Sequence, residues 1–481
     1  MLGTTVMIPS FLVPQMGGSD GDKARVIQSL LFVAGINTYL QTLFGTRLPS
    51  VIGGSYAFLI PTLTIINSSR LQSISTSGQR FLSTMRAIQG ALIASSSLQI
   101  ILGFSGLWGI FTRFLSPLGS APAIALVGLG LYGLGFPGVA KCVEVGLLEF
   151  LLLVLLSLYL RQVGPKRMPL FERMPILLSV PVIWAFAYLL TVSGAYRNVP
   201  SKTKLHCRTD EANLISSSPW IRIPYPLEWG APSFDAGETF GMMAAVFTSL
   251  VESTAAFLAV SRLASATPPP AYVLSRGSGW QGVGILLSGL FGTSTGSTVS
   301  VENAGLLGIT RVGSRRVVQI SAAFMVFFSI FGKFGAFFAS IPFPIFSAIY
   351  CVLFGIVAAT GVSFLQFVNL NTIRTLFIVG LALFMGMSVP KYFSEYTASA
   401  GHGPADTNAR WFNDIINTIF SSAVTVALIV AVFLDNTYHV EVSKKDRGMP
   451  WWAKFRTFKG DSRSEEFYSL PFHLHRFFPP S

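Results

Sequence analysis

The stretch Gly292–Arg316, GTSTGSTVSVENAGLLGITRVGSRR, lies between long apolar runs but is itself polar and rich in Gly, Ser and Thr. It carries one carboxylate, Glu302. In a membrane-embedded chain, such backbone is tolerated only where it is buried in protein or lines a watery cavity. A short, interrupted span of this kind is the best sequence indication of a transport site. The stretch therefore predicts a binding site, provided that the flanking chain lies in a membrane.

The composition is that of a membrane protein with many spans. Of the 481 residues, 51% are hydrophobic and only 11% are charged, whereas an average soluble domain carries roughly 25% charged residues. The net charge of +13 lies mainly in short loops and in the tail after Asp435. This distribution follows the positive-inside rule and argues against a nucleic-acid partner. The three cysteines, Cys142, Cys207 and Cys351, suggest neither a disulfide framework nor a metal site.

The apolar runs predict about fourteen spans, with ends uncertain by a few residues. Besides the quoted stretch, we expect them near residues 1–14, 26–44, 48–66, 84–104, 117–135, 143–160, 173–193, 237–261, 280–291, 315–339, 343–361, 370–389 and 411–434. The first run is only about half the length of a spanning helix. The chain therefore begins inside the membrane or has a truncated first helix, and no cleavable signal peptide is expected.

A second broken segment, Leu48–Ile66, contains Gly-Gly-Ser and an internal Pro61. The sequence Leu-Phe-Gly-Thr precedes it at residues 43–46 and recurs at residues 290–293, just before the rest of the quoted stretch. Paired broken helices at equivalent places are expected when two inverted halves surround a central site.

Two acidic residues are candidates for the site. Glu252 lies in GMMAAVFTSLVESTAAFLAV, which has no other charge, and a carboxylate there costs on the order of 2.5–3.5 kcal/mol on insertion scales. Glu302 is surrounded by flexible polar backbone and is followed by Asn303. Two carboxyls and the free amides of a half-helix suit a small planar molecule rich in N–H and C=O groups, and both acids can carry protons. The alternatives are a carboxyl satisfied by neighbouring Ser and Thr for Glu252, and a helix cap for Glu302.

Other polar or aromatic residues are weaker candidates for a functional role. Tyr56 and Phe58 could stack on a flat ligand or pack in the core. Lys333 could pair with an acid or extend to the membrane surface, and we favour a structural role. Glu144 and Glu149 are explained by solvation near a helix end, while Asn67 begins a glycosylation sequon. All histidines fall outside the expected spans, and no phosphate-binding loop is present, so we expect no enzyme activity, no metal and no cofactor.

The segment ENAGLLGITR resembles the signature of the nucleobase–ascorbate transporter family. That signature has Gln, Glu or Pro, then Asn, any residue, Gly, four more residues, Thr and a basic residue or Gly. The matching positions are Glu302, Asn303, Gly305, Thr310 and Arg311. The VGSRR continuation, the SATPPP loop and VES around Glu252 are most similar to the plant branch. The resemblance extends over nearly the whole chain.

The resemblance implies an all-α polytopic membrane protein with about fourteen segments in two inverted repeats, with short extended stretches in segments three and ten. A core domain (1–113 and 237–340) would move against a gate domain (114–195 and 341–436). An extracellular loop (196–236) and a cytoplasmic tail (437–481) complete the chain, which is expected to form a homodimer.

By the same resemblance, Glu252, Glu302 and the backbone of Tyr56 and Val301 would bind the substrate, and Asn303 would support the geometry. The remaining residues expected to support binding or proton coupling are Ser300, Gly305, Thr310 and Arg311.

These features predict a plasma-membrane symporter that imports uracil, xanthine or related bases with protons. An acid at the first signature position resembles uracil and purine carriers, whereas animal ascorbate carriers have Pro there. Two features depart from the family: the Gln-His pair of its first helix is absent, and Ala256 stands where bacterial and fungal relatives have a polar residue. An ascorbate transporter and a truncated, non-transporting membrane protein therefore remain as alternatives.

Overall fold

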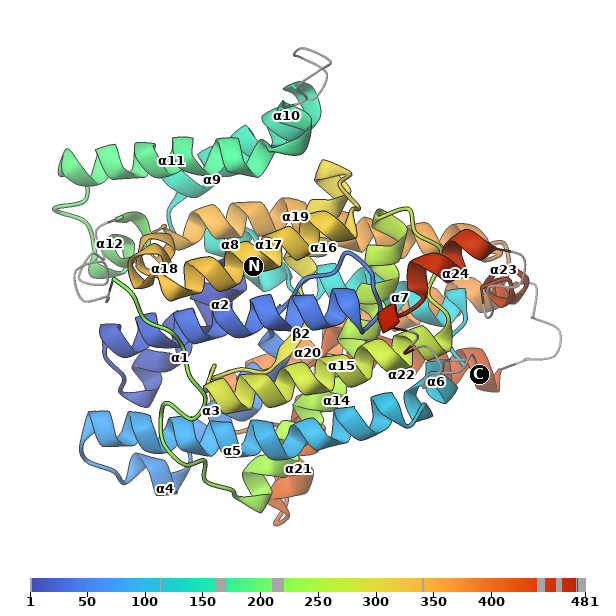
Figure 1. The fold of residues 1–481 in the computed structure, drawn as a ribbon, viewed down its shortest axis with the longest axis horizontal. Coiled ribbons are helices and arrows are strands. Elements are labelled where there is room, and N and C mark those ends of the chain that lie inside the picture. Colours follow the sequence, from blue (N-terminus) through green and yellow to red (C-terminus); the bar gives the residue numbers. More distant parts are fainter. Residues whose placement is uncertain are drawn as a thin grey trace.

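The computed structural model describes residues 2–112, 114–160, 170–209, 220–339, 341–438, 446–455, 461–472 and 474. The described chain is mostly helical, and its long helices lie side by side in an elongated bundle (Figure 1). The elements of its first part are α1 (Leu2–Met16), α2 (Asp20–Leu43), β1 (Ile52–Gly54), η1 (Tyr56–Phe58), α3 (Leu59–Ile66), α4 (Ser69–Gln72), α5 (Ser77–Phe104), α6 (Leu107–Thr112), α7 (Pro117–Leu129), η2 (Tyr132–Leu134), α8 (Phe136–Val139), α9 (Val143–Val154), η3 (Leu155–Tyr159), α10 (Leu170–Arg173), α11 (Pro175–Val192) and α12 (Ser201–Cys207).

The second part of the chain contains α14 (Ala236–Leu263), α15 (Ala271–Phe291), β2 (Ser297–Val299), α16 (Val301–Thr310), α17 (Arg315–Ile330), α18 (Gly332–Ala339), α19 (Phe343–Ser363), η5 (Phe364–Phe367), α20 (Ile373–Ala400), α21 (Arg410–Phe420), α22 (Ala423–Thr437), α23 (Met449–Ala453) and α24 (Ser462–Tyr468). Among the described residues, seven helices are long and apolar enough to cross a membrane, or eight if the bent pair α21–α22 is one span. A polytopic helical membrane protein is thus supported, while the layout with about fourteen spans stays a prediction.

Several expected spans differ from the helices observed. Helix α15 begins at Ala271 rather than near residue 280, and α20 continues to Ala400 rather than ending near residue 389. The start of α15 is polar, yet Ser275, Arg276 and Ser278 are buried against other helices, so the apolar pattern missed it. The span expected at residues 411–434 is two helices, α21 and α22, bent by 84° at a short break.

The two broken segments meet in the middle of the bundle. Strands β1 and β2 pair antiparallel, with Ile52 opposite Val299 and Gly54 opposite Ser297. The side-chain amide of Gln281 donates to the Ser297 carbonyl at 3.0 Å, which gives this buried backbone oxygen a hydrogen-bond partner. The extended stretches expected in both broken segments are therefore present. Each strand leads into a helix, η1 and α3 after β1 and α16 after β2.

The long helices pack in two groups. In the first group, α2 packs against α17 and α15, and α5 packs against α15 and α14. In the second, α7 packs against α19, α20 and α22, and α9 packs against α11 and α19. Small residues permit close crossings: a Cβ on Gly103 of α5, for example, would lie 2.2 Å from the amide nitrogen of Gly279 on α15. Such approaches of small residues are typical of helix pairs in membranes.

The prediction that the cysteines form no disulfide is wrong. Cys142, just before α9, is bonded to Cys207 at the end of α12, with their Cα atoms 5.5 Å apart. The two residues are separated by 65 positions in the sequence, so only the folding of the 194–209 segment back onto α9 brings them together. Cys351 is a free thiol.

Candidate substrate-binding site

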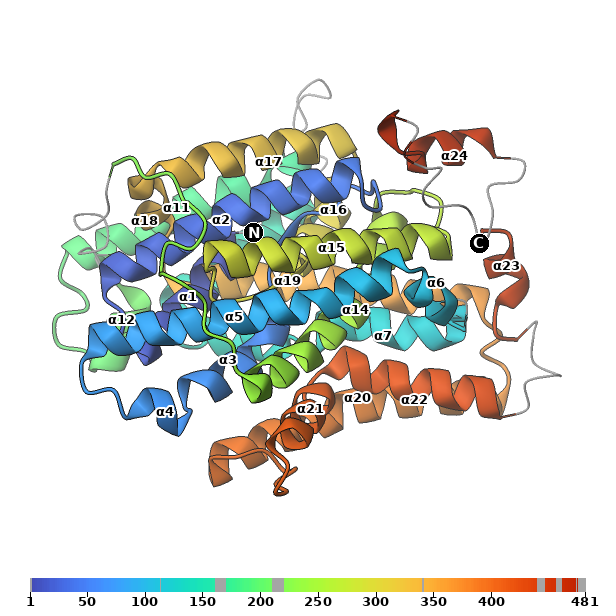
Figure 2. The same ribbon diagram turned by 60° about the horizontal axis from the view of Figure 1, so that its bottom comes forward.

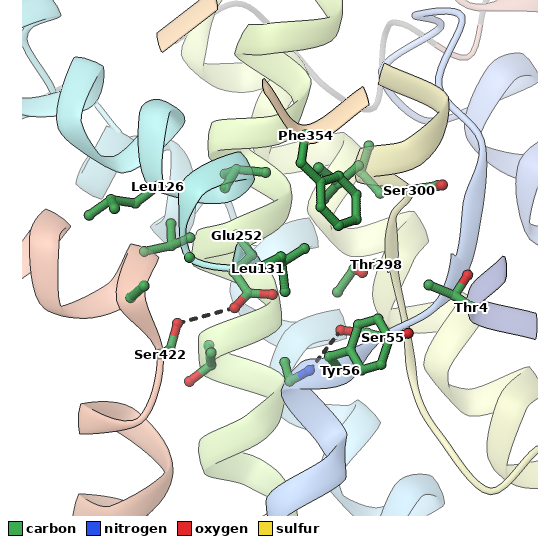
Figure 3. Close-up of a pocket in the computed structure, with 18 of the residues that line it drawn as sticks. Thr4, Ser55, Tyr56, Leu126, Leu131, Glu252, Thr298, Ser300, Phe354 and Ser422 are labelled. Carbon is green, nitrogen blue, oxygen red and sulfur yellow. Dashed lines mark hydrogen bonds between the residues drawn. The ribbon is translucent and has the colours of Figure 1, made fainter. Parts of the chain in front are cut away.

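A cavity of about 160 Å³ lies where the two broken segments meet the second helix group. Figure 3 shows that side chains from several elements, including α7, α14 and the α21–α22 break, surround it. An apolar cavity of about 150 Å³ accepts a benzene molecule, so this space is large enough for a planar ring. Its lining residues include Thr4, Ser55, Tyr56, Leu126, Leu131, Thr248, Glu252, Thr298, Ser300, Val301, Glu302, Phe354, Thr418, Ser421 and Ser422.

Two helix starts lie on this cavity. Ser55 caps η1 by accepting the Ala57 N–H at 3.1 Å, and Ser300 caps α16 by accepting the Asn303 N–H at 3.3 Å. The N–H groups of the first turn, at Tyr56 and Val301, have no carbonyl partner inside their own helices. They also lie at the positive end of the helix dipole. Both are therefore suited to hold a carbonyl oxygen of a ligand.

Glu252 reaches the cavity from the middle of α14. Its Oε1 accepts a hydrogen bond from the Ser422 hydroxyl at 3.1 Å (Figure 3). Ser422 is also the N-cap of α22, because its oxygen accepts the Thr425 N–H. Glu252 on the first helix group is thus joined directly to the second group across the cavity.

Glu302 is the second residue of α16 and is only 6% exposed. Its Oε1 accepts the backbone N–H of Thr4 at 3.1 Å, which connects α16 to α1. The hydroxyls of Tyr56 and Tyr350 are near enough to this carboxylate for an electrostatic interaction with it. Glu302 and Glu252 line the same cavity, while their binding of a substrate stays a prediction.

The other residues of the signature lie elsewhere. Asn303 is not among the lining residues, and its backbone N–H completes the cap of α16. Gly305 faces α19, where a Cβ would lie 2.4 Å from the Leu353 carbonyl oxygen. Thr310 bonds back to the Leu306 carbonyl, and Arg311 ends α16 with a positive φ of 54°. These residues shape and position α16 but do not line the cavity.

Sequence reasoning missed the residues of the second helix group that line the cavity. Thr418 comes from α21, Ser421 and Ser422 come from the break between α21 and α22, and Leu131 and Phe354 contribute apolar surface. The adjacent serines at 421–422, inside the run TIFSSAVTV, were the available signal, since paired small polar residues can interrupt a membrane helix.

Three further expectations can be compared with the structure. Glu149 is not solvated at a helix end: it is fully buried, and its Oε1 accepts the Ser179 hydroxyl at 2.6 Å. The reason is that α11 packs over that face of α9. Lys333 places its ammonium over the Trp220 ring, 4.7 Å from the centroid, in agreement with a structural role. Phe58 is buried in a hydrophobic cluster and does not line the cavity.

Apolar helices around two unwound segments, with carboxylates and helix starts on one cavity, define the class of membrane transport proteins. The chain belongs to the permease family whose sequence model, that of the xanthine/uracil permeases, matches residues 1–395. This class consists of transporters rather than enzymes.

Similarity to named relatives indicates a narrower group of transporters within this family. The chain is 65% identical over 480 residues to nucleobase-ascorbate transporter 2 of Arabidopsis thaliana, covering 100% of this chain and 92% of that protein. It is 63% identical over 482 residues to nucleobase-ascorbate transporter 1 of the same plant, with 100% and 93% covered. These matches confirm the resemblance seen in the sequence, including its plant character.

Two solved structures show distant similarity. The transmembrane domain of the cyanobacterial bicarbonate transporter BicA gives a TM-score of 0.37 at 16% identity, covering 89% of this chain and 96% of that chain. SLC26A9 gives a TM-score of 0.45 at 12% identity, covering 78% and 62%.

Proposed function

We propose that this protein is a secondary active transporter that imports uracil, xanthine or a related base together with protons. The observation that carries the proposal is the joint presence of Glu252, Glu302 and the first N–H groups of η1 and α16 on one small cavity. Carboxylates accept the ring N–H groups of a base, and the helix N–H groups donate to its carbonyl oxygens.

Proton coupling would use the same two carboxyls. A carboxylate inside a membrane bundle is costly to keep charged, so transfer of a proton to it during the transport cycle is favourable. Ser422 donates a hydrogen bond to the Glu252 carboxylate. A proton and a base arriving together would release this contact.

The movement we propose is elevator-like. The core domain (1–113 and 237–340) carries both broken segments, and the gate domain (114–195 and 341–436) supplies the opposite wall of the cavity. Sliding of one helix group past the other would expose the cavity first to one side of the membrane and then to the other. We further propose a homodimer in the plasma membrane, with loop 196–236 outside and the tail inside.

Ascorbate is the second candidate substrate, because the names of the Arabidopsis relatives include it. Ascorbate is an anion at neutral pH, and two carboxyls on a small cavity disfavour an anion by like-charge repulsion. A neutral base has no such penalty. The acid at position 302 therefore favours a nucleobase.

Uptake of radiolabelled bases in a cell that lacks base transport tests the proposal. We expect saturable uptake of at least one base, stimulation by an acidic exterior, and weak competition by ascorbate. Competition by ascorbate at concentrations similar to those of the bases would favour the second candidate. Surface-expressed protein that transports neither class would identify a non-transporting membrane protein instead.

A further inference from the structure

The C-terminal tail lies beyond residue 395, where the match to the family model ends. Two of its segments are described: residues 446–455, which contain α23, and residues 461–472, which contain α24. Both lie at the same end of the bundle, and Figure 2 shows them well separated from each other there. The hydrogen bonds and ion pairs of the two go to different helix groups, while Trp452 and Phe455 of the first segment also lie beside the start of α15.

We name residues 446–455 the gate foot, because they contact elements of the second helix group. The Arg447 guanidinium pairs with the buried Asp435 of α22 at 2.9 Å. The Asn369 side-chain amide, in the connection before α20, donates to Asp446 Oδ1 at 2.9 Å. The Trp451 ring stacks on Phe367 of η5, with centroids 3.7 Å apart and planes 11° from parallel.

We name residues 461–472 the core foot, because they contact elements of the first group. Two arginines at the ends of core helices, Arg276 of α15 and Arg315 of α17, each donate at 3.0 Å, to the carbonyls of Tyr468 and Phe467 respectively. The Arg315 guanidinium also lies 5.0 Å from the Phe467 ring centroid. These carbonyls are at the end of α24, where backbone oxygens lack partners within the helix and the dipole is negative.

The core foot supplies hydrogen-bond acceptors to arginines of the core. Arg276 is only 1% exposed, and the acceptors shown for it are the carbonyls of Gly45 and Tyr468. Burial and the neighbouring Arg315 and Arg316 lower the pKa of Arg47, in the loop after α2, to about 10. This surface is thus strongly positive, and the carbonyl end of α24 lies on it. Tyr468 is only 1% exposed and belongs to a hydrophobic cluster, so apolar burial and hydrogen bonds together hold the core foot.

We propose that the tail is a strap that holds the two helix groups in the arrangement seen here, and that transport requires the core foot to detach. This inference rests on the proposed function, since it assumes that the groups move relative to each other. The core foot is the one expected to detach. Its hydrogen bonds to the core arginines use neutral main-chain carbonyls beside the buried Tyr468, whereas the gate foot is held by a buried ion pair and a close ring stack.

A reversible cross-link tests the strap. The hydroxyl oxygens of Thr267 and Ser464 are 2.5 Å apart, so the double variant Thr267→Cys/Ser464→Cys, in a Cys351→Ala background, should form a disulfide that locks the core foot. The matched control, Asn369→Cys/Asp446→Cys, locks only the gate foot. We expect oxidation of the first variant to reduce uptake at least tenfold, with recovery after reduction, and oxidation of the control to leave uptake nearly unchanged.

Unchanged uptake with the core foot fully cross-linked would overturn the proposal, as would an equal loss in the control.

A second measurement does not depend on transport activity. Hydrogen exchange of the α24 amides should increase in Arg315→Ala, and not in Arg316→Ala, because Arg316 bonds Gln319 of its own helix. If the wild-type chain transports no base, the proposed function fails. The docking of α24 is still decided by the exchange rates, and equal exchange in both variants would refute it.

Discussion

At the scale of single residues, Glu302 has the most specific prediction. Its carboxylate lies at the start of α16, is nearly buried and accepts the Thr4 N–H. A hydrogen bond to a charged group contributes about 1.5–3 kcal/mol, so Glu302→Gln should lower uptake roughly ten- to a hundredfold without preventing membrane insertion. Glu395→Gln is the control, because Glu395 is exposed and pairs only with Lys391 at 3.0 Å among the contacts observed. Equal uptake by both variants, measured at matched surface expression, would refute the role of Glu302.

Ser422 is the residue that joins the two walls of the cavity. Ser422→Ala removes both the donor to Glu252 and the cap of α22. Loss of an N-cap costs about 1 kcal/mol, so we expect a lower melting temperature in detergent and reduced uptake. Ser422→Thr keeps a hydroxyl and should recover most of both. A Thr variant as impaired as the Ala variant would show that the hydroxyl is not the important feature.

At the scale of elements, the position of α16 depends on Gly305. A Cβ at this residue would lie 2.4 Å from the Leu353 carbonyl oxygen, which belongs to rigid helix backbone. Overpacking of this kind typically costs about 1–3 kcal/mol, and moving α16 away from α19 would also move Glu302 and Val301.

We therefore expect Gly305→Ala to lower both the melting temperature and uptake. Gly355→Ala on α19 is the matched control, since nothing lies within 4 Å of the position its Cβ would take. If both variants behave like the wild type in a thermal shift and an uptake assay, α16 tolerates the displacement and this account of Gly305 is wrong.

At the scale of the whole molecule, the Cys142–Cys207 disulfide fastens α12 to the start of α9. Disulfides persist in oxidising compartments, which supports the placement of loop 196–236 outside the cell. Removing a disulfide typically costs about 2–4 kcal/mol, so Cys142→Ser should lower the melting temperature, whereas Cys351→Ser should change it little.

Thiol labelling checks the pairing directly. In denaturant without reductant, a maleimide reagent should modify one thiol per wild-type chain, that of Cys351, and should modify all three after reduction. Three labelled thiols without reductant would show that the bond does not form in the cell.

The sequence by itself determined the class of protein and the main candidates for the site. The low charge content and the repeated apolar runs require a lipid environment, and the polar stretch around Glu302 is tolerated in lipid only beside a cavity. Placing an acid in an apolar run costs enough insertion free energy that the sequence alone identified Glu252 as a candidate. These energetic costs depend on a few residues that are neighbours in the sequence, so a single sequence is enough to recognise them.

Only the tertiary structure decided which distant residues meet. The Ser422–Glu252 contact spans 170 positions, and the Cys142–Cys207 bond spans 65. No local pattern encodes these pairs, because they result from helix packing and the folding back of a loop. The same holds for Glu149, buried by α11, and for the carbonyls of α24 that reach Arg276 and Arg315. Hydropathy measures a residue's own affinity for lipid, whereas these contacts depend on which face of a helix another helix covers.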